Sequence, residues 1–474
     1  MRLLAAVCHA ATILVLPEAT VRVQQDGSSP HSGHTLPDVH AAPGLHHKLR
    51  QELTNFEDLQ YFSNITVGGQ QITGILDTGS FELVVFDSNC TGCGTAGRYG
   101  RNRSATFFNA GMEHGQYYGS GMLHTTEAFD LVSIGPFNAV NLSFWDAYSA
   151  FMPVLHNARF QSIIGVGPPE TPAADAWTQL KRSVDFITGD LEQGFLPAAS
   201  QGDRIRKNLE LSVEMSKTLR MVQALNISTF SVCLGKKPGS AGFFVWNDPS
   251  QREQPALFRH IPVMGRHTWT VNMSSVRLIN DTQLELPIGC GKGCGAIIDS
   301  GTSLLLMPTD AVDMIARALS VPGINCSNMH EFPDLVFDLA GQTFSLPPDA
   351  YIADMHDPMQ AATSAHWVRF AKKRIVSPCS LAVMESYSET HWGPLWILGM
   401  PFFRKYYVSF TLGRSHDERK ISIATASPEC TPAIALAAYK TKQRTESVHR
   451  SYNLSHMFLP TIVRKAASEK FLDL

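Results

Sequence analysis

Two aspartates, Asp77 and Asp299, stand in closely similar surroundings and could share one chemical task. Each follows two aliphatic residues and precedes a short run that contains hydroxyl residues and one glycine. Two carboxyl groups held close together cannot both ionise cheaply, so such a pair shares a proton and offers an acid and a base at once. The repeated motif therefore predicts general acid–base chemistry, provided that the fold brings the two copies together. The accompanying residues are Thr78, Gly79 and Ser80 in the first copy, and Ser300, Gly301, Thr302 and Ser303 in the second.

Each copy of the motif is predicted to be a buried strand that delivers its carboxylate to a tight turn. Aliphatic residues suit a buried strand, glycine permits an unusual backbone, and hydroxyl groups can donate hydrogen bonds to carboxylate oxygens. One copy alone would indicate little, because an ordinary Asx turn has a similar composition. A matching second element, two aliphatic residues and a glycine, follows at residues 163–165 and again at 397–399. The same order in both halves predicts two similar lobes that each contribute one aspartate.

On these residues the sequence resembles the pepsin-like aspartic peptidases, from about residue 56 to residue 426. Residues 56–62 are similar to the start of a mature enzyme of this family, and residues 118–121 to the tip of its flap. Residues 396–410 match the family most closely. The resemblance implies a mainly β, bilobal pepsin-like acid protease fold, with two pseudo-symmetric β-barrel-like lobes and a cleft between them.

The resemblance also implies roles for the residues of these motifs. Asp77 and Asp299 would be the catalytic pair, and the seven residues that accompany them would support the dyad. Tyr118, with Gly119 and Ser120, would form a flap that closes over the substrate.

The flap region departs from the family at one position. Val84 stands where many relatives carry a tryptophan that hydrogen-bonds the flap tyrosine, so the resting position of Tyr118 stays open. Phe160 and Ile163 would line an apolar pocket beside the scissile bond, although packing in the core would explain them nearly as well.

The function that the resemblance implies is hydrolysis of peptide bonds by a dyad-activated water, at acidic pH, with a preference for apolar residues around the scissile bond. Neither a metal nor a cofactor is expected. The alternative is a peptide-binding protein on the same fold that has lost its activity. A metal-dependent hydrolase that uses His46 and His47 is disfavoured, because these residues lack a plausible ligand set.

Length and composition agree with a two-lobed body. The 474 residues exceed what one hydrophobic core usually serves. Hydrophobic residues make up 44% and charged ones 17%, which predicts a folded chain. The formal net charge of −3 provides no basic field for nucleic acid. The resemblance implies polypeptide substrates as the partners, and a monomer is the expected state.

The N-terminus indicates the secretory pathway. Arg2 precedes an apolar run from Leu3 to Leu16, and Ala19 follows soon after, which predicts a signal peptide over residues 1–19. The run is too short to span a membrane, and no later stretch is apolar for long enough. Nine N-x-S/T glycosylation acceptors support this route. The expected destination is secretion, an acidic vesicle or a lysosome-like compartment.

The remaining chain divides into four parts. Residues 20–56 are predicted to be a short propeptide or flexible leader, residues 57–235 the N-terminal lobe, and residues 236–430 the C-terminal lobe. In the leader region, Lys48 or Arg50 could place a cation against the dyad in a zymogen or be a simple surface charge. The basic extension, residues 431–474, is expected to be solvated or trimmed rather than bound to lipid or a partner.

A helical insertion is predicted within the N-terminal lobe, at about residues 170–225. Apolar residues recur there at helical spacing and predict two helices, separated by a polar excursion at about residues 190–208. These residues are Trp177, Leu180, Val184 and Ile187, then Leu211, Met215, Leu219 and Val222.

The eight cysteines that remain after removal of the signal peptide are expected to be oxidised. The resemblance implies three disulfides, Cys90–Cys93, Cys290–Cys294 and Cys326–Cys379. Some relatives join the strand that contains Cys233 to the C-terminus, which predicts a fourth bridge, Cys233–Cys430. A metal or redox role for the C-x-x-C pair is less favoured in a secreted chain.

Overall fold

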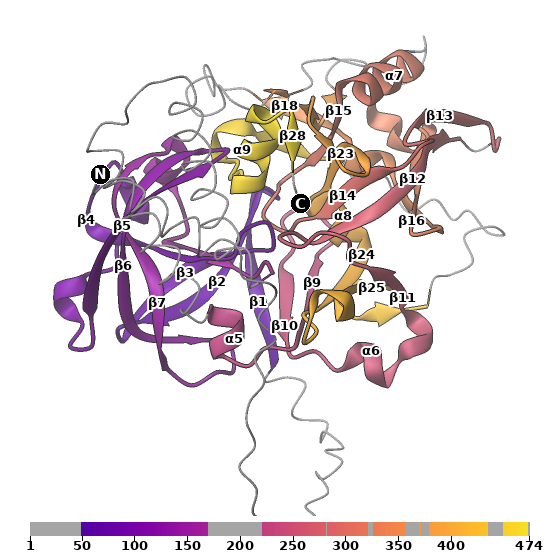
Figure 1. The fold of residues 1–474 in the computed structure, drawn as a ribbon. Coiled ribbons are helices and arrows are strands. Elements are labelled where there is room, and N and C mark those ends of the chain that lie inside the picture. The colour runs from indigo at the N-terminus through magenta and orange to yellow at the C-terminus, as the bar shows by residue number, and fades with distance from the viewer. Residues whose placement is uncertain are drawn as a thin grey trace, which may run out of the picture. The chain divides into compact units, whose positions relative to one another are not determined.

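The computed structural model describes residues 49–168, 220–280, 282–320, 326–356, 369–370, 379–434 and 449–472. All of them belong to one compact unit, Pro43–Leu474. The predicted signal peptide, most of the predicted leader and most of the predicted helical insertion lie outside the described residues. Strands predominate in the described parts, which confirms the mainly β prediction (Figure 1).

A 14-stranded sheet contains the N-terminal half of the body and continues into strands from its C-terminal half. The strand order is β11-β25-β24-β9-β10-β1-β2-β3-β8-β4-β7-β6-β5, and β26 pairs with β25. The strands from the N-terminal half are β1 (Arg50–Phe56), β2 (Gln60–Val67), β3 (Gln70–Asp77), β4 (Leu83–Thr91), β5 (Phe108–Tyr118), β6 (Gly121–Ile134), β7 (Val140–Phe151), β8 (Ser162–Gly165), β9 (Thr229–Leu234) and β10 (Gly242–Trp246). Those from the C-terminal half are β11 (Arg259–Pro262), β24 (Tyr406–Thr411), β25 (Lys420–Ala426) and β26 (Pro432–Ala433).

An 11-stranded sheet forms most of the C-terminal half. Its main path is β17-β16-β12-β14-β23-β15-β21-β19, and β13, β22 and β28 pair at its margins. Its strands are β12 (Thr270–Ile279), β13 (Glu285–Gly289), β14 (Cys294–Ile298), β15 (Leu305–Pro308), β16 (Asp334–Leu339), β17 (Gln342–Leu346), β19 (Arg369–Phe370), β21 (Val383–Ser386), β22 (Glu389–Thr390), β23 (Gly393–Leu398) and β28 (Phe471–Leu472). A third sheet has the order β20-β18-β27, from β18 (Ile352–His356), β20 (Ser380–Leu381) and β27 (Ser451–Asn453).

The helices are short, and most lie at the margins of the sheets (Figure 1). The α-helices are α5 (Met221–Ala224), α6 (Ser250–Glu253), α7 (Thr309–Leu319), α8 (Met400–Lys405) and α9 (Thr461–Ser468). The 3-10 helices are η1 (Gly94–Ala96), η2 (Arg101–Arg103), η3 (Pro153–Asn157), η4 (Pro255–Leu257), η5 (Cys326–Glu331), η6 (Pro348–Ala350), η8 (His416–Glu418) and η9 (Leu454–His456).

The strand that leads to each aspartate has the predicted aliphatic-Gly element as its parallel neighbour. In the N-terminal half β3 pairs with β8, and Asp77 lies opposite Gly165. In the C-terminal half β14 pairs with β23, and Ile298 lies opposite Leu398. Every residue of β8 and β14 is buried, because both faces of these strands are covered. The repeated sequence pattern therefore corresponds to a repeated structural unit.

Residues 449–472, here called the C-terminal segment, fold against the body. The segment contains β27, η9, α9 and β28, drawn in yellow in Figure 1. β27 pairs in parallel with β18, and β28 pairs in parallel with β22. The expectation of a solvated extension is therefore wrong for these residues, because the segment has an apolar side that the body buries. Its buried apolar residues are Tyr452, Leu454, Met457, Phe458, Leu459, Ile462, Val463, Ala466 and Leu472.

The predicted insertion can be compared with the structure only at its end. Val222 lies in helix α5, as the pattern predicts. The backbone of Arg220, the residue before this helix, is extended, with φ −75° and ψ 159°. A continuous helix from Leu211 to Val222 is therefore wrong, and the other residues of the two predicted helices lie outside the described residues.

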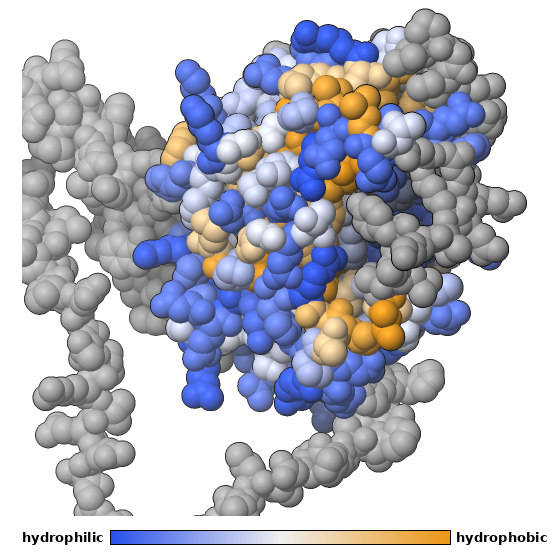
Figure 2. Space-filling view, turned by 90° about the vertical axis from the view of Figure 1, so that its right-hand side faces the viewer, coloured by the Kyte–Doolittle hydropathy of each residue, from blue (hydrophilic) through white to orange (hydrophobic). Residues whose placement is uncertain are grey.

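The face shown in Figure 2 is largely hydrophilic, and apolar residues gather there only in separate patches. Among the described residues, no helix has both the length and the apolar character needed to span a membrane.

Candidate active site

The two aspartate turns bond directly to each other. Thr78 Oγ1 donates to the carbonyl oxygen of Ile298 at 3.1 Å and accepts from the backbone N–H of Ser300 at 2.8 Å. In the reverse direction, Ser300 Oγ donates to the carbonyl oxygen of Leu76 at 2.8 Å and accepts from the backbone N–H of Thr78 at 3.2 Å. These four nearly symmetrical bonds tie the end of β3 to the turn after β14, so the fold brings the two motif copies together.

Each glycine of the motif holds one carboxylate and approaches the other. The N–H of Gly79 donates to Asp77 Oδ1 at 2.9 Å, and the N–H of Gly301 donates to Asp299 Oδ1 at 2.9 Å. A Cβ atom on Gly79 would lie 2.6 Å from Asp299 Oδ2, and one on Gly301 would lie 2.1 Å from Asp77 Oδ1. The two carboxyl groups therefore face each other across turns that have no room for a side chain at either glycine.

Both carboxyl groups are completely buried. Burial, and then the neighbouring Asp299 carboxyl, raises the pKa of Asp77 well above its ordinary value. Burial also raises the pKa of Asp299, against the effect of hydrogen bonds from Thr302 and Gly301 that favour its charged form. Thr302 Oγ1 donates to Asp299 Oδ2 at 2.5 Å. The pair can therefore retain a proton at a pH where an exposed aspartate is ionised.

Ser80 and Ser303, the other two residues predicted to support the dyad, also make hydrogen bonds to neighbouring backbone; a hydrogen bond from the Ser80 side chain lowers the pKa of Asp77. The carbonyl oxygen of Ser80 accepts from the N–H of Gly167 at 2.7 Å. Ser303 Oγ donates to the carbonyl oxygen of Leu59 at 2.7 Å and contacts that of Phe458 at 3.4 Å. Ser303 thus links its turn to the 56–62 stretch and to the C-terminal segment rather than to a carboxylate.

Tyr118 lies at the tip of the β5–β6 hairpin. It pairs with Gly121 across a two-residue turn formed by Gly119 and Ser120. The Tyr118 side chain is buried, and its hydroxyl donates to Gln116 Oε1 at 2.9 Å. A glutamine on the same strand thus supplies the hydroxyl partner, and this settles the resting position that the sequence left open.

The predicted pocket residues lie together in one apolar cluster beside Asp77. Phe160 and Ile163 are fully buried there with Ile75 and Val84, and with Tyr118 of the hairpin. The same cluster contains Phe458.

The contribution of the C-terminal segment to this site was missed by the sequence analysis. The Phe458 ring lies 5.9 Å from that of Tyr118 and 5.8 Å from that of Phe160, between centroids. Pro460 Cγ would lie 2.8 Å from a Cβ atom on Gly301. A usable signal was present, because Ile462, Val463 and Ala466 recur at helical spacing after the apolar run 457–459. The basic charge of the tail led to the opposite expectation.

The cysteines form bridges around the site rather than within it. The structure contains the disulfides Cys90–Cys93, Cys233–Cys430 and Cys290–Cys294. Cys379 is also disulfide-bonded, and the side chain of Cys326, its predicted partner, lies outside the described residues.

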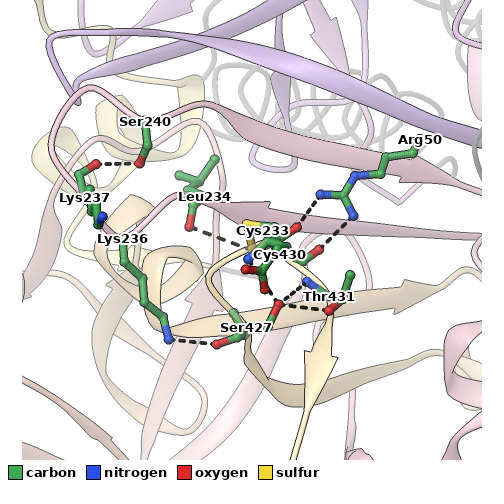
Figure 3. Close-up of a disulfide and its surroundings, with 11 residues drawn as sticks. Arg50, Cys233, Leu234, Lys236, Lys237, Ser240, Ser427, Cys430 and Thr431 are labelled. Carbon is green, nitrogen blue, oxygen red and sulfur yellow. Dashed lines mark hydrogen bonds between the residues drawn. A yellow bond between two sulfur atoms is a disulfide. The ribbon is translucent and has the colours of Figure 1, made fainter.

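Arg50 lies beside the Cys233–Cys430 disulfide (Figure 3). Its guanidinium donates to the carbonyl oxygens of Glu429 at 2.5 Å and Cys430 at 3.2 Å, and lies 3.6 Å from the centre of the Phe243 ring. Arg50 is therefore not the cation that was considered for the dyad, whereas Lys48 lies outside the described residues.

No group of three or more His, Cys, Asp or Glu side chains in the described part of the chain could hold a metal ion. His46 and His47 lie outside that part.

Comparison with known proteins agrees with this geometry. Residues 60–426 match the model of the eukaryotic aspartyl protease family. The chain is 26% identical to cathepsin E of Cavia porcellus, over 80% of this chain and 84% of that protein. It is 25% identical to pepsin A of Bos taurus, over 77% and 85% of the two chains, and 26% identical to renin of Rattus norvegicus, over 76% and 78%. The chain therefore belongs to the eukaryotic aspartyl protease family, whose members are aspartic-type endopeptidases with the pepsin-like fold.

Proposed function

We propose that Asp77 and Asp299 form the catalytic dyad of an aspartic endopeptidase that acts on polypeptides. The observation that carries this proposal is the reciprocal bonding of the two turns, which sets two buried carboxyl groups face to face. Each carboxyl group also receives a backbone N–H from the glycine of its own motif.

The chemistry follows from one proton shared by two carboxyl groups. The ionised carboxylate removes a proton from water as the water oxygen bonds to the peptide carbonyl carbon, and the protonated carboxyl group gives its proton to the carbonyl oxygen. Collapse of this tetrahedral species breaks the C–N bond: the leaving nitrogen takes a proton from one carboxyl group of the dyad, and a hydroxyl group of the species returns a proton to the other, which restores the shared proton. Because the two groups interact strongly, the acid and base roles belong to the pair.

The β5–β6 hairpin supplies the means of holding an extended peptide. The N–H groups of Gly119 and Ser120 donate to the carbonyl oxygens of Pro460 and Leu459, so this tip can bond a peptide backbone whatever its side chains are. The apolar cluster of Ile75, Phe160 and Ile163 would favour a large apolar side chain next to the scissile bond.

An acidic working pH is proposed from the same dyad. As pH rises through the raised pKa of Asp77, the shared proton is lost and the acid disappears; at low pH both groups are protonated and the base disappears. We further propose that the enzyme acts as a monomer in the secretory pathway, either secreted or in an acidic vesicle or lysosome-like compartment.

Substitution of each aspartate tests the dyad. We expect Asp77→Asn and Asp299→Asn to lower kcat/KM by at least a thousandfold on an unstructured protein at acidic pH, because each change removes a member of the shared-proton pair. Both changes are made in the full chain and again together with Phe458→Ala. The second background is used because the Phe458 side chain occupies the apolar cluster that would take a substrate side chain.

The control is Asp417→Asn, whose side chain is 96% exposed. It should retain full activity, and all variants should retain the thermal transition of their parent. Undiminished hydrolysis by either dyad variant would overturn the assignment. A chain that binds a hydroxyl-bearing peptide mimic but cleaves nothing in any variant would instead be the inactive peptide-binding protein.

A further inference from the structure

We propose that the C-terminal segment, residues 449–472, is an intramolecular inhibitor of this peptidase. The segment occupies the place of an extended peptide between the hairpin tip and the aspartate turns, and it must leave before a polypeptide can reach the dyad. This inference rests on the proposed function of the site.

The hairpin tip binds the segment mainly through backbone groups. The N–H of Gly119 donates to the Pro460 carbonyl at 3.1 Å, and the N–H of Ser120 donates to the Leu459 carbonyl at 3.3 Å. Ser120 Oγ accepts from the N–H of Leu459 at 2.7 Å and contacts the carbonyl of Met457 at 3.3 Å. A tip that bonds successive backbone groups is the expected means of holding a peptide of any sequence.

The segment also contacts the turn that carries Asp299 and the apolar cluster next to the dyad. The Phe458 carbonyl lies 3.4 Å from Ser303 Oγ, and the Phe458 ring is buried against Tyr118 and Phe160. The Pro460 ring packs on the Gly301 turn beside Asp77. With this segment in place both carboxyl groups have no exposed surface, so a substrate carbonyl cannot reach them.

The backbone after Pro460 does not follow the course expected of an extended substrate. Helix α9 begins at Thr461, and the Pro460 carbonyl accepts from the N–H groups of both Gly119 and Arg464. The chain therefore turns into a helix at the point where a substrate would continue as an extended strand.

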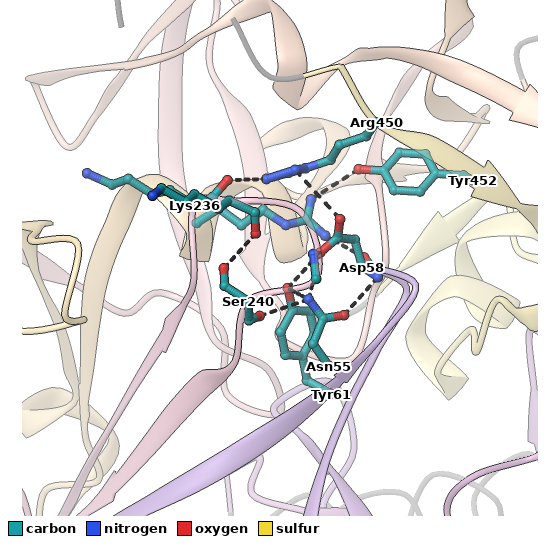
Figure 4. A network of polar contacts seen from close by, with 10 residues as sticks. Asn55, Asp58, Tyr61, Lys236, Ser240, Arg450 and Tyr452 are labelled. Carbon is teal, nitrogen blue, oxygen red and sulfur yellow. Dashed lines mark hydrogen bonds and ion pairs between the residues drawn. The ribbon is translucent and has the colours of Figure 1, made fainter. Parts of the chain in front are cut away.

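One anchor of the segment is a buried polar network before β27 (Figure 4). Arg450 is 2% exposed; its Nη1 lies 3.8 Å from Asp58 Oδ2, and its Nη2 donates to the carbonyl oxygen of Lys236 at 2.5 Å. Arg404, from the body, donates to the Tyr452 hydroxyl at 3.2 Å and to the carbonyl oxygen of Asp58. A buried arginine with these partners indicates a docked position for the segment.

A second anchor lies after the dyad. The hydroxyl groups of Ser386 and Ser388 donate to the carbonyl oxygen of Ala466 at 3.1 and 2.7 Å, and Ser388 also donates to that of Glu469 at 2.5 Å. β28 then pairs with β22. Because the segment is tied down on both sides of the site, it competes as an intramolecular ligand at a high effective concentration.

The first experiment weakens the binding of the segment to the body without removing the segment from the chain. Phe458→Ala leaves the anchors intact, and Lys470→Ala, an exposed change in the same segment, is the control. We expect Phe458→Ala to lower KM for an unstructured protein substrate at least tenfold with little change in kcat, because a competing intramolecular ligand raises apparent KM. The Lys470→Ala chain should match the parent.

Binding separates this inference from the proposed function. The probe is a fluorescent apolar hexapeptide with a hydroxyl-bearing carbon in place of the scissile carbonyl. Tighter binding by Phe458→Ala without hydrolysis in any variant would support the inhibitory segment and overturn the peptidase. Equal KM and equal probe affinity in the parent and Phe458→Ala would overturn the inhibitory segment while leaving the peptidase in place.

A measurement on the unaltered full chain covers the case in which Phe458→Ala fails to fold. Hydrogen exchange of residues 451–468 is followed with and without saturating probe. We expect the probe to accelerate exchange at Leu459 and through α9, because the segment must leave the site. Probe binding with unchanged protection of this segment would overturn the inference.

Discussion

At the scale of single residues, the two aspartates share a motif but not an environment. Asp299 receives a hydroxyl hydrogen bond from Thr302 as well as the N–H of Gly301. Hydrogen bonds to a carboxylate stabilise its charged form, so these donors oppose the effect of burial on the Asp299 pKa. For Asp77, burial and the adjacent carboxyl group outweigh the opposing hydrogen bonds from Ser80 and Gly79, and its pKa is raised well above the usual range. The close approach of the two carboxyl groups favours a single shared proton over two independent titrations.

Asp146 is a buried carboxyl group outside the dyad, and it gives a residue-scale prediction about stability. Burial raises its pKa to about 7, although Arg101 at 3.4 Å opposes this. A raised folded-state pKa stabilises the fold fully below the unfolded value near 4, and this stability is lost as pH rises through about 7. The complete loss corresponds to about 4 kcal/mol.

We therefore expect Asp146→Asn to flatten the fall in unfolding free energy between pH 4 and pH 8. The measurement is urea unfolding at a series of pH values, with the exposed Asp417→Asn as the matched control. An Asp146→Asn chain whose stability falls with pH as steeply as the parent would show that this carboxyl group is not responsible.

At the scale of elements, the β5–β6 hairpin depends on a glycine at the start of β6. Gly121 has φ +147°, and a Cβ atom there would lie 2.1 Å from the carbonyl oxygen of Phe151. This contact is with backbone of β7, so it cannot be relieved by turning a side chain. The hairpin tip is thus placed by its close approach to β7 as well as by its own turn.

The prediction at this scale is that Gly121→Ala displaces the hairpin. It should lower the free energy of unfolding by about 2 kcal/mol, because the substitution adds both a strained backbone and a steric clash. It should also lower kcat/KM, since Gly119 and Ser120 lie in the same turn. The control is Gly115→Ala on β5, where the atom nearest to an added Cβ, Tyr117 Cε2, would lie 3.9 Å away.

Chemical denaturation and initial rates check both parts of this prediction. Equal stability of Gly121→Ala and Gly115→Ala would contradict it.

At the scale of the whole molecule, the 14-stranded sheet joins chain segments that are far apart in sequence. β9 lies between β10 and β24, so strands from the two halves of the body share one hydrogen-bonded path. The Cys233–Cys430 disulfide (Figure 3) connects β9 to the chain just beyond β25 and spans 197 positions. The Cys90–Cys93 disulfide spans 3 positions. The two bridges close loops of very different length.

Removal of these disulfides should therefore have unequal effects. A disulfide stabilises the fold because it lowers the entropy of the unfolded chain. This effect contributes about 5 kcal/mol to the free energy of unfolding for the long loop and about 2 kcal/mol for the short one. We expect the double substitution Cys233→Ala and Cys430→Ala to destabilise the chain more than Cys90→Ala with Cys93→Ala. Urea unfolding followed by tryptophan fluorescence measures the difference, and equal losses from both pairs would contradict the prediction.

Much of the dyad could be predicted because its signals are local and occur twice. The motifs at Asp77 and Asp299, and the aliphatic-Gly elements that pair with their strands, each lie within a few consecutive residues. A buried strand followed by a glycine turn leaves a short pattern of residue types, and a second copy makes chance a poor explanation. The hairpin with Tyr118 at its tip was predicted in the same way, from a short motif at the expected distance.

The tertiary structure decided what lies over the dyad. Phe458 meets Tyr118 and Phe160, and Arg450 meets Asp58, although hundreds of positions separate these partners. The apolar spacing within residues 457–466 indicates a buried face, but it does not specify which distant residues that face meets, and the basic composition of the tail indicated solvent instead. The sequence by itself thus determined which residues form the dyad pattern and which strands carry them. Burial of a distant apolar segment against the body, which no short stretch of sequence specifies, decided whether a substrate can reach that dyad.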